Sequence, residues 1–556
     1  YDQTCAAEKR RRRKRGTFPD PDRRAFINEA VCEGCGDCSV QSNCVSVEPL
    51  ETPLGRKRRI NQSACNKDFS CIRGFCPSFV TVSGAVPRRA QATSVDALDA
   101  AAALLPDPAV AEAEGGYNIL VAGIGGTGVI TVGALLGMAA HVEGKGVTVL
   151  DFTGIAQKNG AVISHIRIAP KPDDLHAVRI AAGGADLLLG ADMVAAAAPD
   201  SLRKLNRGGT QAIINSHLAP TADFTLNPDT EFHGDDLRSL IRNGAGDNRT
   251  EFVDATSLAT TLMGDAIAAN LFLLGYAYQR GALPVSGDAI DKAIELNGVA
   301  VAMNRRAIAL GRLAAEDLDQ VTRMAQPAMP AREAVEKTQD DIIGHRAAFL
   351  TEYQDADYAA QYIAFVRQVE LAEQNKGKGM TGLTEAVAQN LFKLMAYKDE
   401  YEVARLYSGE PFRAALAQQF DGDLKLKFHL APPLLAKRNP DSGELVKREY
   451  GPWVMTTFKL LAKMKGLRGG AWDIFGRTEE RRAERAAIPA YRTVMEELLA
   501  GLTPDNHALA REIANIPAQI RGFGHIKERS QKAAAAEQAQ LLEVWRNPQS
   551  QPTAAE

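Results

Sequence analysis

The stretch Cys32-Glu-Gly-Cys35-Gly-Asp-Cys38-Ser-Val-Gln-Ser-Asn-Cys44 has two residues between each of its first three cysteines and five before the fourth. This spacing is typical of iron–sulfur clusters that are held by Cys thiolates. A second run, Cys65-x5-Cys71-x4-Cys76-Pro77, follows the same plan, with Asp68 at the position of the middle cysteine. The two runs contain seven of the eight cysteines of the chain.

In ferredoxins with two clusters, the fourth cysteine of each run binds the cluster of the other run. This rule assigns one [4Fe–4S] cluster to Cys32, Cys35, Cys38 and Cys76. It assigns a second cluster to Cys44, Cys65 and Cys71, with Asp68 either as an oxygen ligand or beside a missing iron. The eighth cysteine, Cys5, lies outside both runs, and we interpret it as a free thiol.

Zinc and disulfide bonds are the alternatives to iron. Structural zinc requires four ligands, usually in two separated pairs, and three cysteines within seven residues fit that pattern poorly. Disulfide bonds are disfavoured because the sequence shows no signal peptide and its cysteines are crowded. We therefore expect iron–sulfur clusters in a protein of the reducing cytoplasm.

Composition limits the class of protein. The chain has 556 residues, 45% of them hydrophobic and 24% charged, with a formal net charge of −3. That length predicts two to four domains, and near neutrality argues against a nucleic-acid partner. No run of about 18 apolar residues is present, so we expect no membrane span. The basic run Lys9 to Arg15 is interpreted as a solvated arm, the alternatives being a contact for an acidic electron carrier or a zinc-dependent nucleic-acid binder.

A glycine-rich turn opens the next region. Tyr117 to Ala122 predicts a strand and Val129 to Ala140 a helix, and between them stands Gly123-Ile-Gly125-Gly126-Thr-Gly128. In this setting glycines let backbone N–H groups approach a pyrophosphate at the helix N-terminus. A strand at 147–150 ends at Asp151, where an acidic residue often meets a ribose hydroxyl. The motif predicts binding of NAD, FAD or the ADP end of coenzyme A, the alternative being a structural turn.

The following segment supplies two further cofactor-binding candidates. Lys158 lies in the polar loop Gly154 to Gly160, and Arg167 lies on the next strand, 161–168, on the same face as His165. Both cations could pair with an anion. Further strands are predicted at 186–189 and 211–215, with helices at 258–279 and 287–310. Such alternation predicts an α/β fold with a parallel, doubly wound sheet.

These motifs together resemble the indolepyruvate:ferredoxin oxidoreductases of the 2-oxoacid:ferredoxin oxidoreductase superfamily. The resemblance is carried by the two cysteine runs, the glycine turn and the segment Gly154 to Ile168. Tyr1-Asp-Gln-Thr-Cys resembles the end of a thiamine-diphosphate domain in the fused bacterial form of the enzyme. The resemblance implies five regions: a basic arm (1–24), a ferredoxin-type domain (25–82), a linker (83–116), a gamma-type domain (117–312) and a mostly helical C-terminal α+β extension (331–535).

The family's activity is the oxidative decarboxylation of aryl-2-oxoacids such as indolepyruvate on thiamine diphosphate and magnesium, with coenzyme A as acyl acceptor and ferredoxin as electron acceptor. The resemblance implies that this chain is the electron-transfer and gamma-domain part of such an oxidoreductase, in a homo-oligomer. Two departures stand out: Asp68 replaces a cysteine, and the magnesium- and diphosphate-binding Gly-Asp-Gly element is absent. Thiamine chemistry is therefore expected on another part of the enzyme, and no catalytic residue is assigned here. The alternative is an iron–sulfur subunit of an NAD(P)-dependent oxidoreductase.

Overall fold

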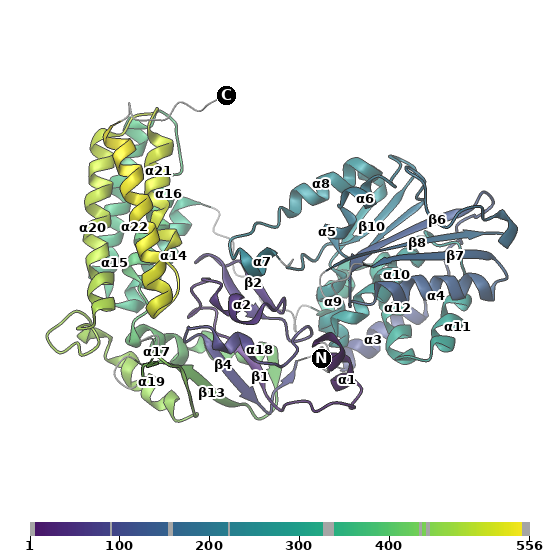
Figure 1. Ribbon diagram of the computed structural model, residues 1–556, viewed down its shortest axis with the longest axis horizontal. Coiled ribbons are helices and arrows are strands. Elements are labelled where there is room, and N and C mark those ends of the chain that lie inside the picture. Colours follow the sequence, from purple (N-terminus) through teal and green to yellow (C-terminus); the bar gives the residue numbers. More distant parts are fainter. Residues whose placement is uncertain are drawn as a thin grey trace.

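The computed structural model describes residues 6–88, 92–153, 160–220, 223–325, 338–432, 436–440 and 445–547. An α/β domain lies at one end of the molecule and a helical bundle at the other, with a cysteine-rich module between them (Figure 1). No helix in these described ranges is long and apolar enough to cross a bilayer.

The α/β domain is built on a six-stranded sheet of order β11-β10-β9-β6-β8-β7. The strands are β6 (Tyr117–Ile124), β7 (Gly146–Thr153), β8 (Ala161–Ala169), β9 (Leu187–Gly190), β10 (Gln211–Asn215) and β11 (Thr250–Val253). The predicted α/β class is confirmed, but the expectation of a fully parallel sheet is wrong. β8 runs antiparallel between β6 and β7, because residues 154–160 are too few for the crossover that a parallel neighbour requires.

Helices cover both faces of this sheet. Ile119 and Val121 of β6 face a core formed with α4 (Val129–Val142), α9 (Ala255–Met263), α10 (Ala269–Gln279), α11 (Gly287–Asn297) and α12 (Val301–Glu316). Leu120 and Ala122 face a second core that includes α5 (Met193–Ala196) and α8 (Gly234–Ala245). The two long helices predicted at 258–279 and 287–310 are each divided, since Gly264 and Gly298 adopt left-handed conformations (φ 77° and 68°) that end α9 and α11.

The predicted linker 83–116 is partly a component of the α/β domain. Within it, α3 (Ala92–Ala103) packs against α12, and Asp99 pairs with Arg306 at 2.6 Å. Buried Ala102 belongs to the same core as β6. The described part of this segment therefore includes a helix that covers the domain.

The cysteine-rich module shares a sheet with the C-terminal region. β1 (Arg24–Ile27) and β4 (Phe79–Ser83) come from the module, whereas β13 (Lys425–Leu430) and β14 (Arg448–Tyr450) come from far along the chain. The order is β1-β4-β13-β14, with Phe428 opposite Val80. A separate hairpin of β2 (Val47–Leu50) and β3 (Lys57–Ile60), with α2 (Asp37–Ser42), completes the module. The ferredoxin-type region predicted at 25–82 thus shares a sheet with the later strands.

The C-terminal region is mostly helical, as predicted. Its helices are α14 (Gln339–Tyr353), α15 (Ala356–Lys376), α16 (Leu383–Met395), α17 (Glu400–Ser408), α18 (Glu410–Gln419), α19 (Val454–Lys463), α20 (Glu479–Gly501), α21 (His507–Asn515) and α22 (Gly524–Arg546). The apolar spacing over 383–407 is that of a helix, but the Asp399 side chain caps a new helix within this range by accepting from Glu402 N. Trp453 and Trp472, whose large side chains would be expected to anchor a core, are 62% and 81% exposed.

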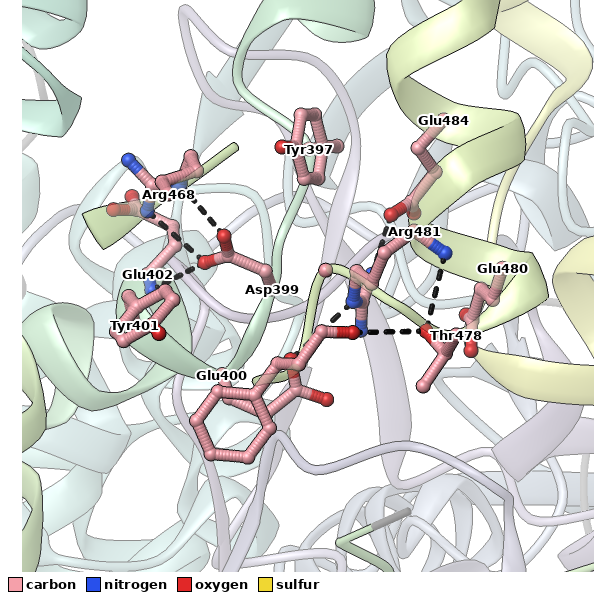
Figure 2. Close-up of polar contacts among 12 residues, drawn as sticks. Tyr397, Asp399, Glu400, Tyr401, Glu402, Arg468, Thr478, Glu480, Arg481 and Glu484 are labelled. Carbon is pink, nitrogen blue, oxygen red and sulfur yellow. Dashed lines mark hydrogen bonds and ion pairs between the residues drawn. The ribbon is translucent and has the colours of Figure 1, made fainter. Parts of the chain in front are cut away.

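A network of buried ion pairs lies where the bundle meets the cysteine-rich module (Figure 2). Arg468 Nε lies 2.6 Å from Asp399 Oδ2, and Arg481 Nη1 lies 2.5 Å from Glu484 Oε2. Arg481 also pairs with Glu400 at 3.3 Å. Burial costs each of these charges its hydration, and the opposite charges offset that cost. The network therefore depends on every partner being present.

Replacing Arg481 by Met should destabilise this part of the molecule. Arg481 is 6% exposed, and its removal leaves Glu400 and Glu484 with fewer compensating charges, which typically costs about 3–5 kcal/mol. Native-state hydrogen exchange of α20 amides should show that loss. The exposed neighbour Arg482 provides the matched control, and Arg482→Met should change the opening free energy by less than about 0.5 kcal/mol. An equal loss of opening free energy in Arg481→Met and Arg482→Met would contradict the stabilising role of the buried ion pairs.

Candidate cluster-binding and nucleotide-binding sites

Four cysteines from the two runs line one small cavity. Cys32 and Cys35 lie in the loop after β1, Cys38 lies in the first turn of α2, and Cys76 lies shortly before β4. The loop that carries Cys76 approaches closely because Gly74 has no side chain: a Cβ there would lie 2.9 Å from Cys38 Cα. The structure thus groups the four residues that the crossed spacing rule assigns to one cluster.

Hydrogen-bonding groups contact at least two of these four sulfurs. Gly34 N donates to Cys32 Sγ at 3.4 Å, and Cys76 Sγ lies 2.7 Å from Ser78 Oγ. Such contacts stabilise thiolates and tune the potential of a bound cluster. Arg58, which is 1% exposed, lines the same cavity and adds positive charge.

Two lysines from the C-terminal region hold the loops of this cavity in place. Lys447 Nζ donates to the carbonyl oxygens of Ile72 (2.8 Å), Gly74 (2.6 Å) and Cys76 (2.9 Å). Lys398 Nζ pairs with Glu33 at 2.5 Å and donates to Cys32 O at 3.2 Å. No local sequence pattern marks Lys447 for this role. Its role in the loop became visible through tertiary contacts between residues more than 370 positions apart.

The chemistry of the donors fits a polynuclear cluster. Burial raises the pKa of the Cys38 thiol well above its usual value, and the neighbouring thiols act in the same direction. Four thiolates can therefore form together only if metal charge is placed among them. No group of His, Cys, Asp and Glu in the described ranges is arranged to hold a single metal ion. A cuboidal iron–sulfur cluster requires a different arrangement of ligands from a single metal ion, because each thiolate binds a different iron.

The second group of predicted ligands also gathers in one place. Burial raises the pKa of Cys71 to about 12, and Cys65, Cys44 and Asp68 are near enough to contribute. Lys67 N donates to Cys65 Sγ at 3.4 Å. Asp68 is exposed, and its Oδ1 accepts from Ser70 N at 3.2 Å. The carboxylate therefore lies at the rim of the group, with one oxygen already hydrogen bonded.

The glycine turn forms the strand–turn–helix arrangement that its sequence predicted. β6 ends at Ile124 and α4 begins at Val129, with Gly126 and Gly128 at φ 82° and 99°. A Cβ on Gly123 would lie 2.5 Å from Val129 Cγ2, so only glycine lets the helix pack this closely on the strand. Asn270 Nδ2 donates to Thr127 O at 3.0 Å and fixes the turn from α10.

A cleft of about 140 Å³ opens beside this turn, at the carboxyl ends of three parallel strands. Gly125 to Thr127 follow β6, Asp192 follows β9, Asn215 is the last residue of β10 and His217 follows that strand. Open α/β sheets bind ligands at such a crevice, where the chain reverses its direction of winding. Burial raises the pKa of Asp192 above its usual value. Asp192 and Asn215 were not predicted, although a polar residue near the carboxyl end of a buried strand is a signal for them.

The cysteine-rich module forms the other wall of the cleft. Asn61 and Ala64 line it together with Arg10 of α1 (Ala6–Lys14), whose Nη1 donates to Ala64 O at 3.2 Å. Ser63 Oγ donates to Asp265 Oδ1 at 3.1 Å and joins the two domains. The basic run, interpreted from sequence as a solvated arm, is in its described part a helix that packs on this wall. The second cysteine group, which includes Cys65, directly follows Ala64.

Not every predicted cofactor-binding residue reaches the cleft. Lys158 lies outside the described residues. Arg167 is paired in register with Asn118 at the start of β6, the opposite end from the turn, and its Nε donates to Asn118 Oδ1 at 2.8 Å. The structure therefore does not bring Arg167 to the turn. Asp151 likewise lies on the edge strand β7 and accepts from Ser164 Oγ instead of facing a ribose beside β6.

Comparison with known families identifies the class of the α/β domain. Residues 118–314 match the family described as pyruvate ferredoxin/flavodoxin oxidoreductase. Residues 339–540 match a separate family of unknown function. The predicted resemblance to the 2-oxoacid:ferredoxin oxidoreductases is thus confirmed over the α/β domain. Neither matched range includes the cysteine runs.

Individual relatives each match about a third of this chain. Indolepyruvate oxidoreductase subunit IorB of Thermococcus kodakarensis is 28% identical over 206 residues, which is 36% of this chain and 97% of that protein. The subunit of the same name from Pyrococcus horikoshii is 29% identical over 206 residues, with the same two coverages. Among solved structures, pyruvate oxidoreductase subunit PORC of Thermotoga maritima matches 36% of this chain and 96% of its own, with 22% identity and a TM-score of 0.26.

Replacing Lys447 by Met should impair the first cysteine group without touching a sulfur. Three carbonyl oxygens lose their shared donor, so the loop before Cys76 should loosen. We expect anaerobically purified Lys447→Met protein to lose one cluster's share of its iron, and electron paramagnetic resonance to show the loss of one signal. Lys459→Met, at an exposed lysine of α19, is the control. Unchanged iron and spectra in Lys447→Met would contradict this role.

Proposed function

We propose that this chain is the electron-transfer and gamma-domain part of an indolepyruvate (aryl-2-oxoacid):ferredoxin oxidoreductase. The observation that supports this most strongly is the placement of the cleft. The glycine turn lines one wall, and the cysteine-rich module, with Cys44 and Cys65 close behind, lines the other. A reaction at the cleft would therefore take place next to an electron carrier.

The residues of this chain would have distinct tasks in that reaction. When bound, [4Fe–4S] clusters supply a one-electron relay between the active site and ferredoxin. The two cysteine groups would hold them, with Asp68 completing the second group. Lys447 and Arg58 would offset the negative charge of the first group. Thiamine diphosphate and magnesium would be held by another domain or subunit of a homo-oligomeric enzyme.

The cleft would take the ADP end of coenzyme A, the acyl acceptor of the proposed reaction. The N–H groups of the turn at the start of α4 would donate to the pyrophosphate. An NAD(P)-dependent enzyme is the alternative function. The position of Asp151 on the edge strand favours coenzyme A, because the acidic residue that binds the ribose of NAD normally follows the strand adjacent to the glycine turn.

Equilibrium binding of coenzyme A and of NADH to the full chain should distinguish these functions. We expect tighter binding of coenzyme A and a loss of about tenfold or more, about 1.4 kcal/mol, in Gly126→Ala. A Cβ at Gly126 strains the turn, whose φ is 82°. Gly144 has φ 73° and open space around its Cα, so Gly144→Ala introduces similar strain away from the cleft. Preference for NADH would support the alternative, and equal losses in both variants would show that the cleft is not the binding site.

Single cysteine substitutions test how the two runs share their clusters. Because Cys76 lines the same cavity as Cys35, Cys35→Ala and Cys76→Ala should abolish the same signal in electron paramagnetic resonance. Cys44→Ala and Cys71→Ala should abolish the other signal. Each variant should lose about four irons per chain, the content of one cubane. Cys5→Ala should lose none. Loss of the Cys44 signal in Cys76→Ala would show that the runs do not cross.

A further inference from the structure

A second cavity, of about 400 Å³, lies between the cysteine-rich module and the helical bundle. The module contributes the β2–β3 turn and the loop after β1, and the bundle contributes α14, α16 and the segment before α22. It shares no lining residue with the glycine cleft. Pockets for small organic ligands typically have volumes of about 300–1,000 Å³.

The lining of this cavity is partly apolar and partly cationic. Leu54 and Phe349 supply apolar lining, and Phe349 packs edge to face on Phe392 at 5.3 Å. The ionisable residues that line the cavity are Glu29, Glu33, Arg56, Lys57, His345, Arg346, Lys393, Lys398 and Arg521. More cationic side chains than carboxylates therefore line the cavity.

Most of these cations already have a partner. Lys398 pairs with Glu33 at 2.5 Å, and Arg521 pairs with Asp229. Lys393 Nζ donates only to a backbone carbonyl, Ala518 O, at 2.7 Å. Lys57 Nζ has no hydrogen bond or ion pair among the described residues. Two ammonium groups thus face the cavity without a carboxylate of their own.

Burial disfavours the charged forms of Lys57 and Lys393. Burial lowers the pKa of Lys57 to about 8, and Lys398 lowers it further, while Glu33 acts in the opposite direction. Burial likewise lowers the pKa of Lys393 to about 7. Glu33 offsets only part of the hydration that these two groups lose on burial. A ligand with two negative charges would compensate both.

We propose that this cavity binds a small phosphate ester, with its phosphate dianion between Lys57 and Lys393 and its apolar part against Leu54 and Phe349. The apolar lining favours an ester over inorganic phosphate, since Phe349 and Leu54 can contact an apolar group but offer inorganic phosphate no hydrogen bond. The site is independent of the proposed oxidoreductase function. It lies next to the first cysteine group, because Lys398 contacts both Glu33 of the cavity and the Cys32 carbonyl.

Calorimetric titration with phenyl phosphate tests the proposal. The full chain with Gly126→Ala is used, so that binding at the glycine cleft does not contribute. We expect saturable binding at pH 7, weaker by at least tenfold in both Lys57→Met and Lys393→Met. Lys459→Met, at an exposed lysine of α19, should bind as the parent does. Absence of saturable binding, equal affinity in Lys57→Met, or equal affinity for inorganic phosphate and phenyl phosphate would overturn it.

The melting temperature of the variants and the pH dependence of affinity provide two further tests. Lys57→Met should melt close to the parent, because Lys398 still pairs with Glu33 at 2.5 Å. A loss of binding in this variant would then not reflect a loss of folding. Binding a dianion should raise both lysine pKa values, so affinity should be highest near pH 7 and fall as pH rises to 9. The ligand keeps its charge over this range, since its second pKa is near 6. Affinity independent of pH would overturn the role of the lysines.

Discussion

Compensation of charge among buried sulfurs is the constraint on which the rest of the structure depends. Four thiols from two runs share one cavity, and burial alone opposes their ionisation. Iron would supply the missing positive charge, and the protein adds Arg58 and Lys447 nearby. The loops around the cavity bring the four thiols together. The loop before Cys76 can approach Cys38 closely because Gly74 has no side chain.

The C-terminal region has a structural part in the cysteine-rich module, although its matched family has no known function. β13 extends the sheet of the module, and Lys398 and Lys447 hold the two cysteine loops. The buried ion network then fixes the bundle near the same place. Removal of this region would therefore expose an edge of β4 and release both loops. The cysteine runs and the distant helices form one structural unit.

Local sequence patterns predicted much of the fold correctly. The bounds of β10 and the start of α4 agree with the hydrophobic runs that predicted them, and cysteine spacing grouped Cys76 with Cys32. Local patterns could not show that β8 inserts between β6 and β7, since strand order depends on how loop length and helix packing combine. The same insertion explains why Asp151 and Arg167 do not reach the glycine turn. Asp192, Asn215 and Lys447 act through contacts that only the folded chain reveals.

The central claim is that the cysteine groups hold iron–sulfur clusters, and the most direct measurement is spectroscopic. The full chain should be purified without oxygen and its visible spectrum recorded before and after dithionite is added. The account predicts a brown protein with a broad absorption near about 400 nm that dithionite bleaches, as expected for thiolate-bound clusters. A colourless protein without iron and acid-labile sulfide would contradict it.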